Sequence, residues 1–171
     1  MSFEEEVAIM QFAVKQVNGR AKIIFGCGSN DTATAVMMAK KAEECGGDGL
    51  LAVTPYYNKC TQNGLVAYYK AICESVSIPV IAYNVPGRTG VEIQPATMAK
   101  IAEIPNMAGM KDAGGNMSKT METLRLVREK CDVYSGEDAL NFPILACGGA
   151  GVISVLSNII PADVKKLCNL V

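Results

Sequence analysis

The sequence predicts an α/β protein, an incomplete TIM barrel in which six strands of a (β/α)8 barrel are present. Two observations carry this prediction. Short apolar runs alternate with longer helical patterns, as in parallel strands that helices cover, and polar or glycine-rich residues stand at the end of every run. No linker-like segment divides the 171 residues, so we expect one partial barrel domain spanning residues 1–171.

Each element has a local signal. Ser2-Phe3-Glu4-Glu5 has the spacing of a capping box and predicts a helix that extends to about Val17. The strand candidates are Ala21–Phe25, Gly49–Val53, Val80–Ala82, Met107–Met110, Asp132–Tyr134 and Gly151–Val155. The helical candidates that follow them are Thr32–Cys45, Gly64–Ser75, Pro95–Ala102, Ser118–Lys130, Ala139–Cys147 and Pro161–Leu170.

The polar, charged and glycine residues that could bind ligands or catalyse a reaction follow the ends of the strands. They are Gly26–Asn30, Thr54–Asn58, Tyr83–Gly90, Lys111, Ser135–Asp138 and Ser157-Asn158. A barrel places its active site at the carboxyl ends of its strands, whereas a doubly wound sheet binds ligands only beside one switch point. Because all six ends carry such residues, the barrel is favoured. A complete barrel has eight strands and about 250 residues, so the barrel is expected to be incomplete.

Composition excludes several classes of protein. The formal net charge is -1 and no basic face is present, which argues against a nucleic-acid partner. No apolar stretch reaches the roughly 18 residues of a membrane span, and the acidic start Glu4–Glu6 is unlike a signal peptide, so we expect a cytoplasmic protein. The chain has no histidine, and its 7 cysteines include no C-x-x-C pair. We therefore expect free, buried thiols, no metal site and no Ser–His or Cys–His machinery.

Lys111 is the strongest candidate for catalysis. It ends the apolar run Met107–Met110 and precedes the turn-like Asp112–Asn116. A buried ammonium is costly, and desolvation lowers the pKa of a lysine, so the neutral amine can attack a carbonyl and form a Schiff base. The alternative is a strand-end lysine whose amine extends to water.

Four motifs resemble the dihydrodipicolinate synthase family, in the class I aldolase superfamily that includes N-acetylneuraminate lyase. They are Thr54–Asn58, Tyr83–Gly90, Gly109–Asn116 and Ser135–Asp138, in matching order and spacing. Asp112 and Gly114 replace the family's usual glutamate and threonine. The family's Gly-Thr-Thr-Gly-Glu loop, which binds the pyruvate carboxylate, and its C-terminal helical segment have no counterpart here. We therefore expect a fragment, or one part of a split or shortened protein, that covers barrel strands three to eight.

The resemblance implies condensation of pyruvate with aspartate 4-semialdehyde, in diaminopimelate and lysine synthesis, without a cofactor. It assigns Lys111 as the Schiff-base nucleophile and Tyr83 as the proton shuttle. Tyr57 matches a tyrosine that crosses a dimer interface to complete the proton relay, and the complete protein is expected to be a dimer of dimers. Without the motifs, these tyrosines would more simply be interpreted as packing residues.

Further residues match binding positions of the family. Arg88 corresponds to the arginine that holds the semialdehyde's carboxylate, a role suited to its forked charge, although a solvated loop arginine is common. Gly136 and Ile153 match residues that line the pyruvate pocket, although a turn glycine and a core isoleucine explain them equally well.

Two further matches concern regulation. Asn30 corresponds to a residue of the lysine feedback site, and Tyr56 to a residue near the dimer interface. Thr34, however, stands where inhibited members commonly carry glutamate. A carboxylate partner for the amino group of lysine is then missing, so we expect weak or absent feedback inhibition.

Two other functions remain open from the sequence. One is a different pyruvate-dependent aldolase, of the N-acetylneuraminate lyase or keto-deoxy-sugar-acid type, against which Arg88 argues. The other is a catalytically inactive fragment that needs a complementary chain. The predicted edge strand Ala21–Phe25 supports the second alternative, because exposed strand edges pair with other chains.

Overall fold

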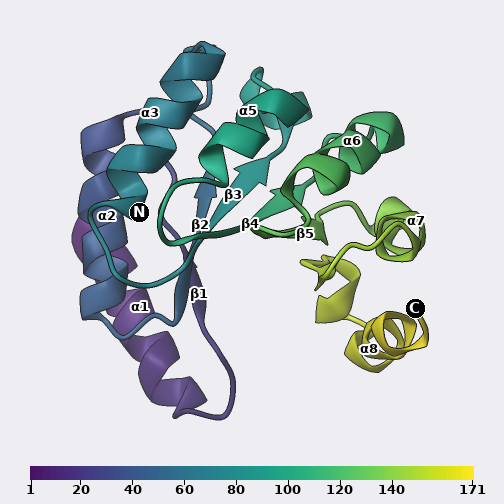
Figure 1. Cartoon of the computed structure of the whole chain (residues 1–171). Helices are drawn as coiled ribbons and strands as arrows, with labels where there is room; N and C mark the ends of the chain where they lie inside the picture. The colour runs from purple at the N-terminus through teal and green to yellow at the C-terminus, as the bar shows by residue number, and fades with distance from the viewer.

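Six parallel strands form one sheet in the computed structural model, which describes all 171 residues (Figure 1). Each strand pairs with the next strand in the chain, in the order β1 to β6. A sheet in sequential order has no switch point, so the doubly wound alternative is wrong and the incomplete barrel is confirmed. The strands are β1 Ile24–Gly26, β2 Gly49–Val53, β3 Val80–Asn84, β4 Met107–Asp112, β5 Asp132–Ser135 and β6 Gly151–Val152.

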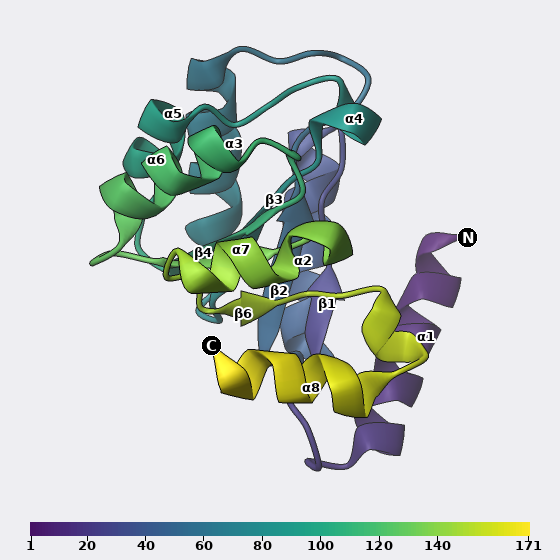
Figure 2. The ribbon, with the colours of Figure 1, turned by 90° about the vertical axis from the view of Figure 1, so that its right-hand side faces the viewer.

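Helices cover the outer face of the curled sheet (Figures 1 and 2). The predicted capping box is present, because Ser2 Oγ accepts from Glu5 N and Ser2 N donates to Glu5 Oε2. The helices are α1 Phe3–Val17, α2 Thr32–Glu44, α3 Gln62–Cys73, α4 Pro86–Thr89, α5 Pro95–Ile101, α6 Met117–Val127, α7 Asn141–Ala146 and α8 Pro161–Leu170, with 3-10 turns η1 Asp138–Leu140 and η2 Leu156–Asn158. None of these helices is both long and apolar enough to cross a membrane.

The main core lies between the sheet and its helices. Leu50 and Ala52 of β2 are fully buried, as is Val80 of β3, because alternate strand residues point toward the helices. Tyr69 of α3 is also fully buried and donates its hydroxyl to the Ala52 carbonyl at 3.1 Å. Each large apolar side chain buried here contributes about 1.5–3 kcal/mol, so this layer stabilises the sheet from its outer face.

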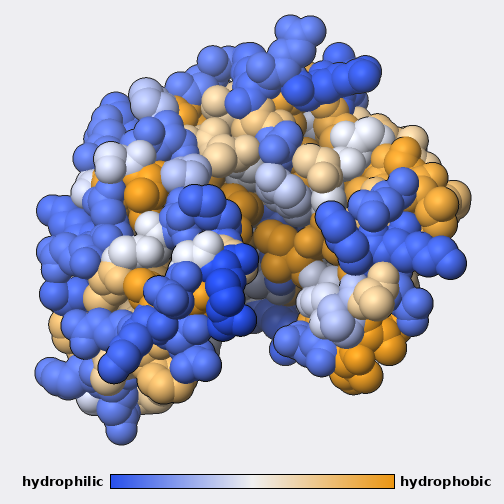
Figure 3. Space-filling view, turned by 90° about the horizontal axis from the view of Figure 1, so that it is seen from below, coloured by the Kyte–Doolittle hydropathy of each residue, from blue (hydrophilic) through white to orange (hydrophobic).

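The inner, concave face is open. A cavity of about 310 Å³ lies at the amino-terminal end of this face, and its lining includes Ile24, Ile81 and Tyr134 from three different strands. The molecule is visibly hollowed in Figure 3, with hydrophobic residues on the wall of the hollow and hydrophilic residues around it. Apolar side chains of the concave face therefore remain in contact with water.

The observed strand ends differ from the predicted ones. Both β3 and β4 extend two residues beyond their predicted ends, because Tyr83 pairs with Lys111 and Asn84 with Asp112 along the ladder. In contrast, β6 ends at Val152, three residues early, since Asp138 Oδ2 accepts from the N–H groups of Val155 and Leu156 and turns the chain. The lysine and tyrosine predicted to follow the strands are thus part of them.

The open edges of the sheet generate a prediction. Residues 1–171 expressed alone should self-associate, because β1 and β6 are unpaired on one side and nearby apolar residues such as Val155 and Ile159 are 71% and 78% exposed. Light scattering after size-exclusion chromatography at micromolar concentrations tests this. Ile24→Lys, on the edge strand β1, should reduce association, whereas Met121→Lys on helix α6 should not. A monodisperse wild-type monomer would show that the open edges do not cause self-association.

Candidate active site at the carboxyl ends of the strands

Lys111 lies between two tyrosines on neighbouring strands. It pairs with Tyr83 of β3 on one side and with Tyr134 of β5 on the other, so the three side chains share one face of the sheet. Lys111 Nζ lies 4.1 Å from the centroid of the Tyr83 ring, and the residue is 9% exposed. The structure thus brings together the two residues that sequence reasoning placed at the centre of the site.

The environment of Lys111 favours the neutral amine. Burial lowers the pKa of Lys111 from its usual value, and the negative charge of Asp138 raises it by a smaller amount. No carboxylate lies within ion-pair distance of the amine. A larger fraction of Lys111 is therefore unprotonated near neutral pH than for a solvated lysine, which is the requirement for nucleophilic attack.

The two flanking tyrosines are not equivalent. Tyr134 donates its hydroxyl to Asp132 Oδ2 at 2.9 Å, and burial together with this carboxylate raises the pKa of Tyr134 to about 12. Its proton is thus held by a partner remote from the amine. Tyr83 has no such carboxylate partner, and its ring faces the Lys111 amine. Of the two phenols, Tyr83 is the better placed to exchange protons with a group bound at Lys111.

Gly136 gives the Lys111 side chain its space. A Cβ at Gly136 would lie 2.8 Å from both Cγ and Cε of Lys111 and 3.2 Å from the Ala113 Cβ, distances that real carbon atoms do not adopt without a shift. The glycine thus packs against the lysine stem directly. Ile153, the other predicted pocket residue, is half-buried, and its N–H donates to the Ser135 carbonyl at 2.8 Å beside this point.

Asp138 is a charged residue of the site to which sequence reasoning assigned no role. It accepts from Ser154 Oγ at 2.5 Å, from Asn141 Nδ2 at 3.0 Å, and from the N–H groups of Val155 and Leu156. Burial alone would raise the pKa of Asp138, but these hydrogen bonds outweigh burial and hold the pKa below its usual value. Asp138 is therefore an anion near Lys111. Its position in the Ser135–Asp138 motif at the end of a strand is the feature of the sequence that could have indicated a role for it.

Tyr57 lies in the segment after β2 and Arg88 in the short helix α4, and neither side chain forms a hydrogen bond with Lys111 or Tyr83. The Tyr57 N–H donates to the carbonyl of Thr89, in the short helix α4 that also contains Arg88. Tyr57 is 90% exposed and adopts a left-handed backbone (φ 75°), which is uncommon for a residue with a side chain. It belongs to no strand, so packing does not explain its position. Arg88 is exposed and belongs to no ion pair.

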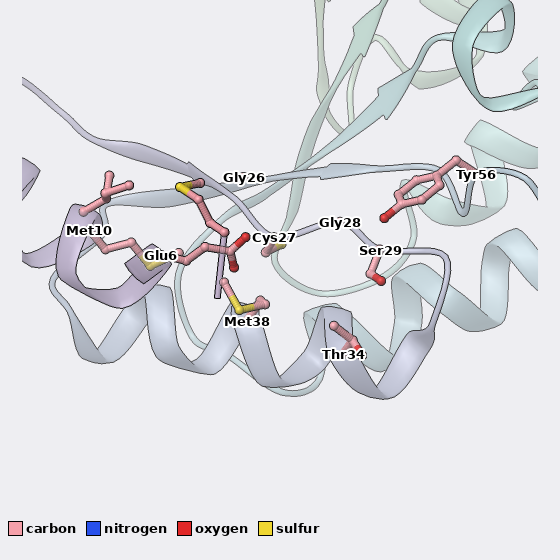
Figure 4. A pocket seen from close by; sticks show the side chains of 11 residues that line it. Glu6, Met10, Gly26, Cys27, Gly28, Ser29, Thr34, Met38 and Tyr56 are labelled. Atoms are coloured by element: carbon pink, nitrogen blue, oxygen red, sulfur yellow. The ribbon is translucent and has the colours of Figure 1, made fainter. Parts of the chain in front are cut away.

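A second cavity, of about 310 Å³, lies between α1, α2 and the segment after β1 (Figure 4). Tyr56 and Thr34 line it on the side of Ser29, with Glu6 and Met38 also in its wall. Asn30, which sequence reasoning grouped with Tyr56, is exposed and does not line the cavity; its carbonyl accepts from Asn58 Nδ2 at 2.9 Å.

No group of three or more potential metal ligands among His, Cys, Asp and Glu occurs in the structure. All seven cysteines are free thiols, but only three of them, Cys27, Cys73 and Cys131, are buried, and Cys147 is exposed. The expectation of buried thiols thus holds only in part. The chemistry available at the strand ends is that of an amine, phenols, a carboxylate and a guanidinium.

The fold and the site together define a (β/α)-barrel protein with a desolvated lysine near the carboxyl end of a strand, an arrangement that suits covalent chemistry on carbonyl compounds. The chain belongs to the dihydrodipicolinate synthetase family, whose model matches residues 1–171. The resemblance inferred from the four motifs is thus confirmed.

Individual relatives agree with this assignment. The 4-hydroxy-tetrahydrodipicolinate synthase of Alkaliphilus oremlandii is 49% identical over 167 residues, which cover 98% of this chain and 58% of the relative. The crystal structure of dihydrodipicolinate synthase from Aquifex aeolicus aligns with a TM-score of 0.96 at 44% identity, over 99% of this chain and 58% of that one. A chloride-inhibited dihydrodipicolinate synthase from Acinetobacter baumannii, complexed with pyruvate, aligns with a TM-score of 0.96 at 42% identity and the same coverage. The chain thus spans 58% of the length of these relatives.

The charge of Asp138 generates a prediction about pH. Because this anion raises the pKa of Lys111, Asp138→Asn should lower that pKa further, so the rate of amine modification at Lys111 should reach its plateau at a lower pH than in the wild type. The rate of reductive methylation at Lys111, followed by peptide mass spectrometry across pH, measures this. Glu137→Gln, at the exposed neighbouring position, is the control and should leave the profile unchanged. A shift toward higher pH in Asp138→Asn would refute the electrostatic account.

Proposed function

We propose that this chain carries the Schiff-base lysine of a 4-hydroxy-tetrahydrodipicolinate synthase, a lyase that condenses pyruvate with aspartate 4-semialdehyde in the biosynthesis of diaminopimelate and lysine. The observation that carries the proposal is the buried Lys111 amine, whose pKa is lowered and which lies over the Tyr83 ring. The names of the relatives and the pyruvate complex of one of them support the choice of reaction.

The proposed reaction begins with the neutral amine of Lys111. Its lone pair attacks the C2 carbonyl carbon of pyruvate, and loss of water from the carbinolamine leaves a protonated imine. This imine withdraws electrons from C3, so a proton leaves C3 and an enamine forms. The enamine carbon then attacks the aldehyde carbon of aspartate 4-semialdehyde. Attack by the product's own amine on the imine carbon closes the ring and releases Lys111, so no cofactor or metal is required.

Protons must move at each of these steps, and we assign that task to Tyr83. Its ring contacts the lysine amine, so its hydroxyl belongs to the same face of the sheet as the imine. We assign Tyr57 to a relay that reaches the site of a neighbouring subunit, because it matches a family tyrosine with that role and its side chain is 90% exposed, free to contact another copy of the chain. A homo-oligomer of at least two subunits follows from this assignment, and we propose the dimer of dimers that the family resemblance implies.

The substrates require recognition as well as chemistry. We assign Arg88 to the carboxylate of the semialdehyde, since it is exposed on α4 and has no ion-pair partner of its own. Gly136 and Ile153 are assigned to the wall of the pyruvate pocket. A side chain at Gly136 would collide with the Lys111 stem, so the glycine allows the lysine its observed position in that wall.

We propose that the protein is cytoplasmic. We also propose that it acts in a natural-length form in which further strands complete the barrel, because the sheet of residues 1–171 has two open edges and the relatives are longer. An effector site involving Tyr56 and Asn30 remains a further proposal. Only Tyr56 of these two lines the cavity in Figure 4, and a threonine at position 34 supplies no carboxylate for a bound amino group.

Borohydride trapping of pyruvate tests the function. Incubation of the natural-length protein with pyruvate and sodium borohydride should add one stable adduct at Lys111, because reduction converts the imine to a secondary amine. Peptide mass spectrometry locates the adduct. Lys111→Ala should abolish it, whereas the exposed Lys166→Ala should not. An adduct at another lysine, or equal labelling of Lys111→Ala, would remove Lys111 from the mechanism.

Arg88→Ala should separate the two substrates. Loss of one charge-assisted contact should cost about 1.5–3 kcal/mol of transition-state stabilisation, seen as a lower kcat/KM for the semialdehyde. Trapping of pyruvate should continue at close to the wild-type rate. Arg88→Lys retains the charge but not the forked geometry, so its kcat/KM for the semialdehyde should lie between the values of the wild type and of Arg88→Ala. Steady-state kinetics with each substrate varied in turn make the comparison. Equal losses for both substrates would indicate a folding defect or another pyruvate aldolase.

A further inference from the structure

The residues that follow Tyr83 and Lys111 meet on the outer face of the sheet. Asn84 pairs with Asp112 in the ladder, one position beyond the pair Tyr83 and Lys111. Successive strand residues point to opposite faces, so these two side chains lie behind the sheet while the lysine and tyrosine lie in front. Asn84 Nδ2 donates to Asp112 Oδ1 at 2.9 Å, and the residues are 3% and 5% exposed.

The other atoms of this pair are also satisfied. Thr120 of helix α6 donates its hydroxyl to Asp112 Oδ2 at 2.6 Å, and the Gly114 N–H donates to Asp112 Oδ1 at 3.0 Å. Asn84 Oδ1 accepts from the N–H of Ile93 at 3.0 Å. Hydrogen bonds to a buried carboxylate are among the stronger ones in proteins, and this set joins β3, β4, α6 and two loops. We call Asn84, Asp112 and Thr120 the carboxylate network.

The bond between Asn84 and Asp112 bears on the register of the ladder between β3 and β4. Its register shifts between Val80 and Ile81, so the backbone pairing is irregular at the beginning of β3. Beyond the shift the pairs run in a single register, from Ile81 with Gly109 to Asn84 with Asp112, and a slip of one residue would move every side chain to the opposite face. A direct bond between Asn84 and Asp112 side chains is compatible with only one register, the one that places Lys111 beside Tyr83.

We infer that the carboxylate network is the positioning device of the active site: Asp112, held by Asn84 and Thr120 behind the sheet, sets the register and the orientation that place the Lys111 amine over the Tyr83 ring. This inference rests on the Schiff-base function proposed above. None of the three residues faces the reacting atoms: Asn84 and Asp112 act through their chain neighbours Tyr83 and Lys111, and Thr120 acts through its hydrogen bond to Asp112. The lysine stem has little freedom to compensate, because it packs against Gly136.

Thr120 offers a test with a matched set of variants. Thr120→Val keeps the shape of the side chain and removes the hydroxyl, whereas Thr120→Ser keeps the hydroxyl and removes the methyl group. Thr123→Val, one turn further along α6, alters a buried threonine that forms no hydrogen bond with Asp112 and serves as the control. The readout is the rate of pyruvate trapping by borohydride in the natural-length protein, as a function of pyruvate concentration.

Thr120→Val should lower the maximal trapping rate about 10- to 100-fold, the range expected for a misplaced nucleophile, with the half-saturating pyruvate concentration within about twofold of the wild type. Thr120→Ser and Thr123→Val should trap at close to the wild-type rate. Thermal unfolding shows that each variant is folded at the assay temperature. If Thr120→Val is not folded there, Asp112→Asn, which keeps the side-chain volume, replaces it with the same expected loss.

The outcomes separate the two proposals. A wild-type protein that pyruvate does not label overturns the Schiff-base function, and the positioning role with it. A labelled wild type combined with an undiminished rate in folded Thr120→Val overturns the positioning role alone. An equal loss in Thr120→Val and Thr123→Val would also overturn it, because any repacking of α6 would then have the same effect.

Discussion

Desolvation of the Lys111 amine is the constraint on which the rest of the site depends. Taking a charged lysine out of water is unfavourable. Lys111 is nevertheless held in this position, because paired strands on both sides fix its backbone and the Tyr83 ring covers its amine. Gly136 gives the stem its space, and Asp138 is close enough to affect the pKa but forms no ion pair that would keep the amine charged. The lowered pKa of Lys111 is therefore a consequence of the packing around it.

The two faces of the sheet have different tasks. The outer face buries a continuous apolar layer with side chains such as Leu50 and Tyr69, and it also contains the carboxylate network at the carboxyl ends of the strands. The inner face holds the reactive groups and an open apolar surface. Stability is thus concentrated behind the strands, which leaves the front free to carry the buried Lys111 amine beside the Tyr83 ring. An exposed apolar inner face and two open edges accompany this arrangement.

Much of this arrangement could be predicted from the sequence. Hydrophobic periodicity placed β2 and α8 at their observed bounds, and the order of polar strand ends distinguished the barrel from a doubly wound sheet. The ends of β3 and β4 could not be predicted, because Asn84 and Asp112 are polar residues whose burial in the strands depends on bonds such as those to each other and to Thr120. Such bonds join positions 28 or 8 residues apart and leave no periodic signal. The contact of Gly136 with the lysine has the same character, and only the family resemblance indicated that this glycine matters.

The central claim is that burial makes the Lys111 amine less basic than an ordinary lysine. An NMR titration of the natural-length protein labelled with 13C at lysine Cε measures it directly, with the Lys111 signal assigned by its absence in Lys111→Ala. The account predicts that the Lys111 signal titrates at a lower pH than the signals of exposed lysines such as Lys166, in the protein without substrate. A Lys111 signal that titrates together with the exposed lysines, or above them, would contradict the account.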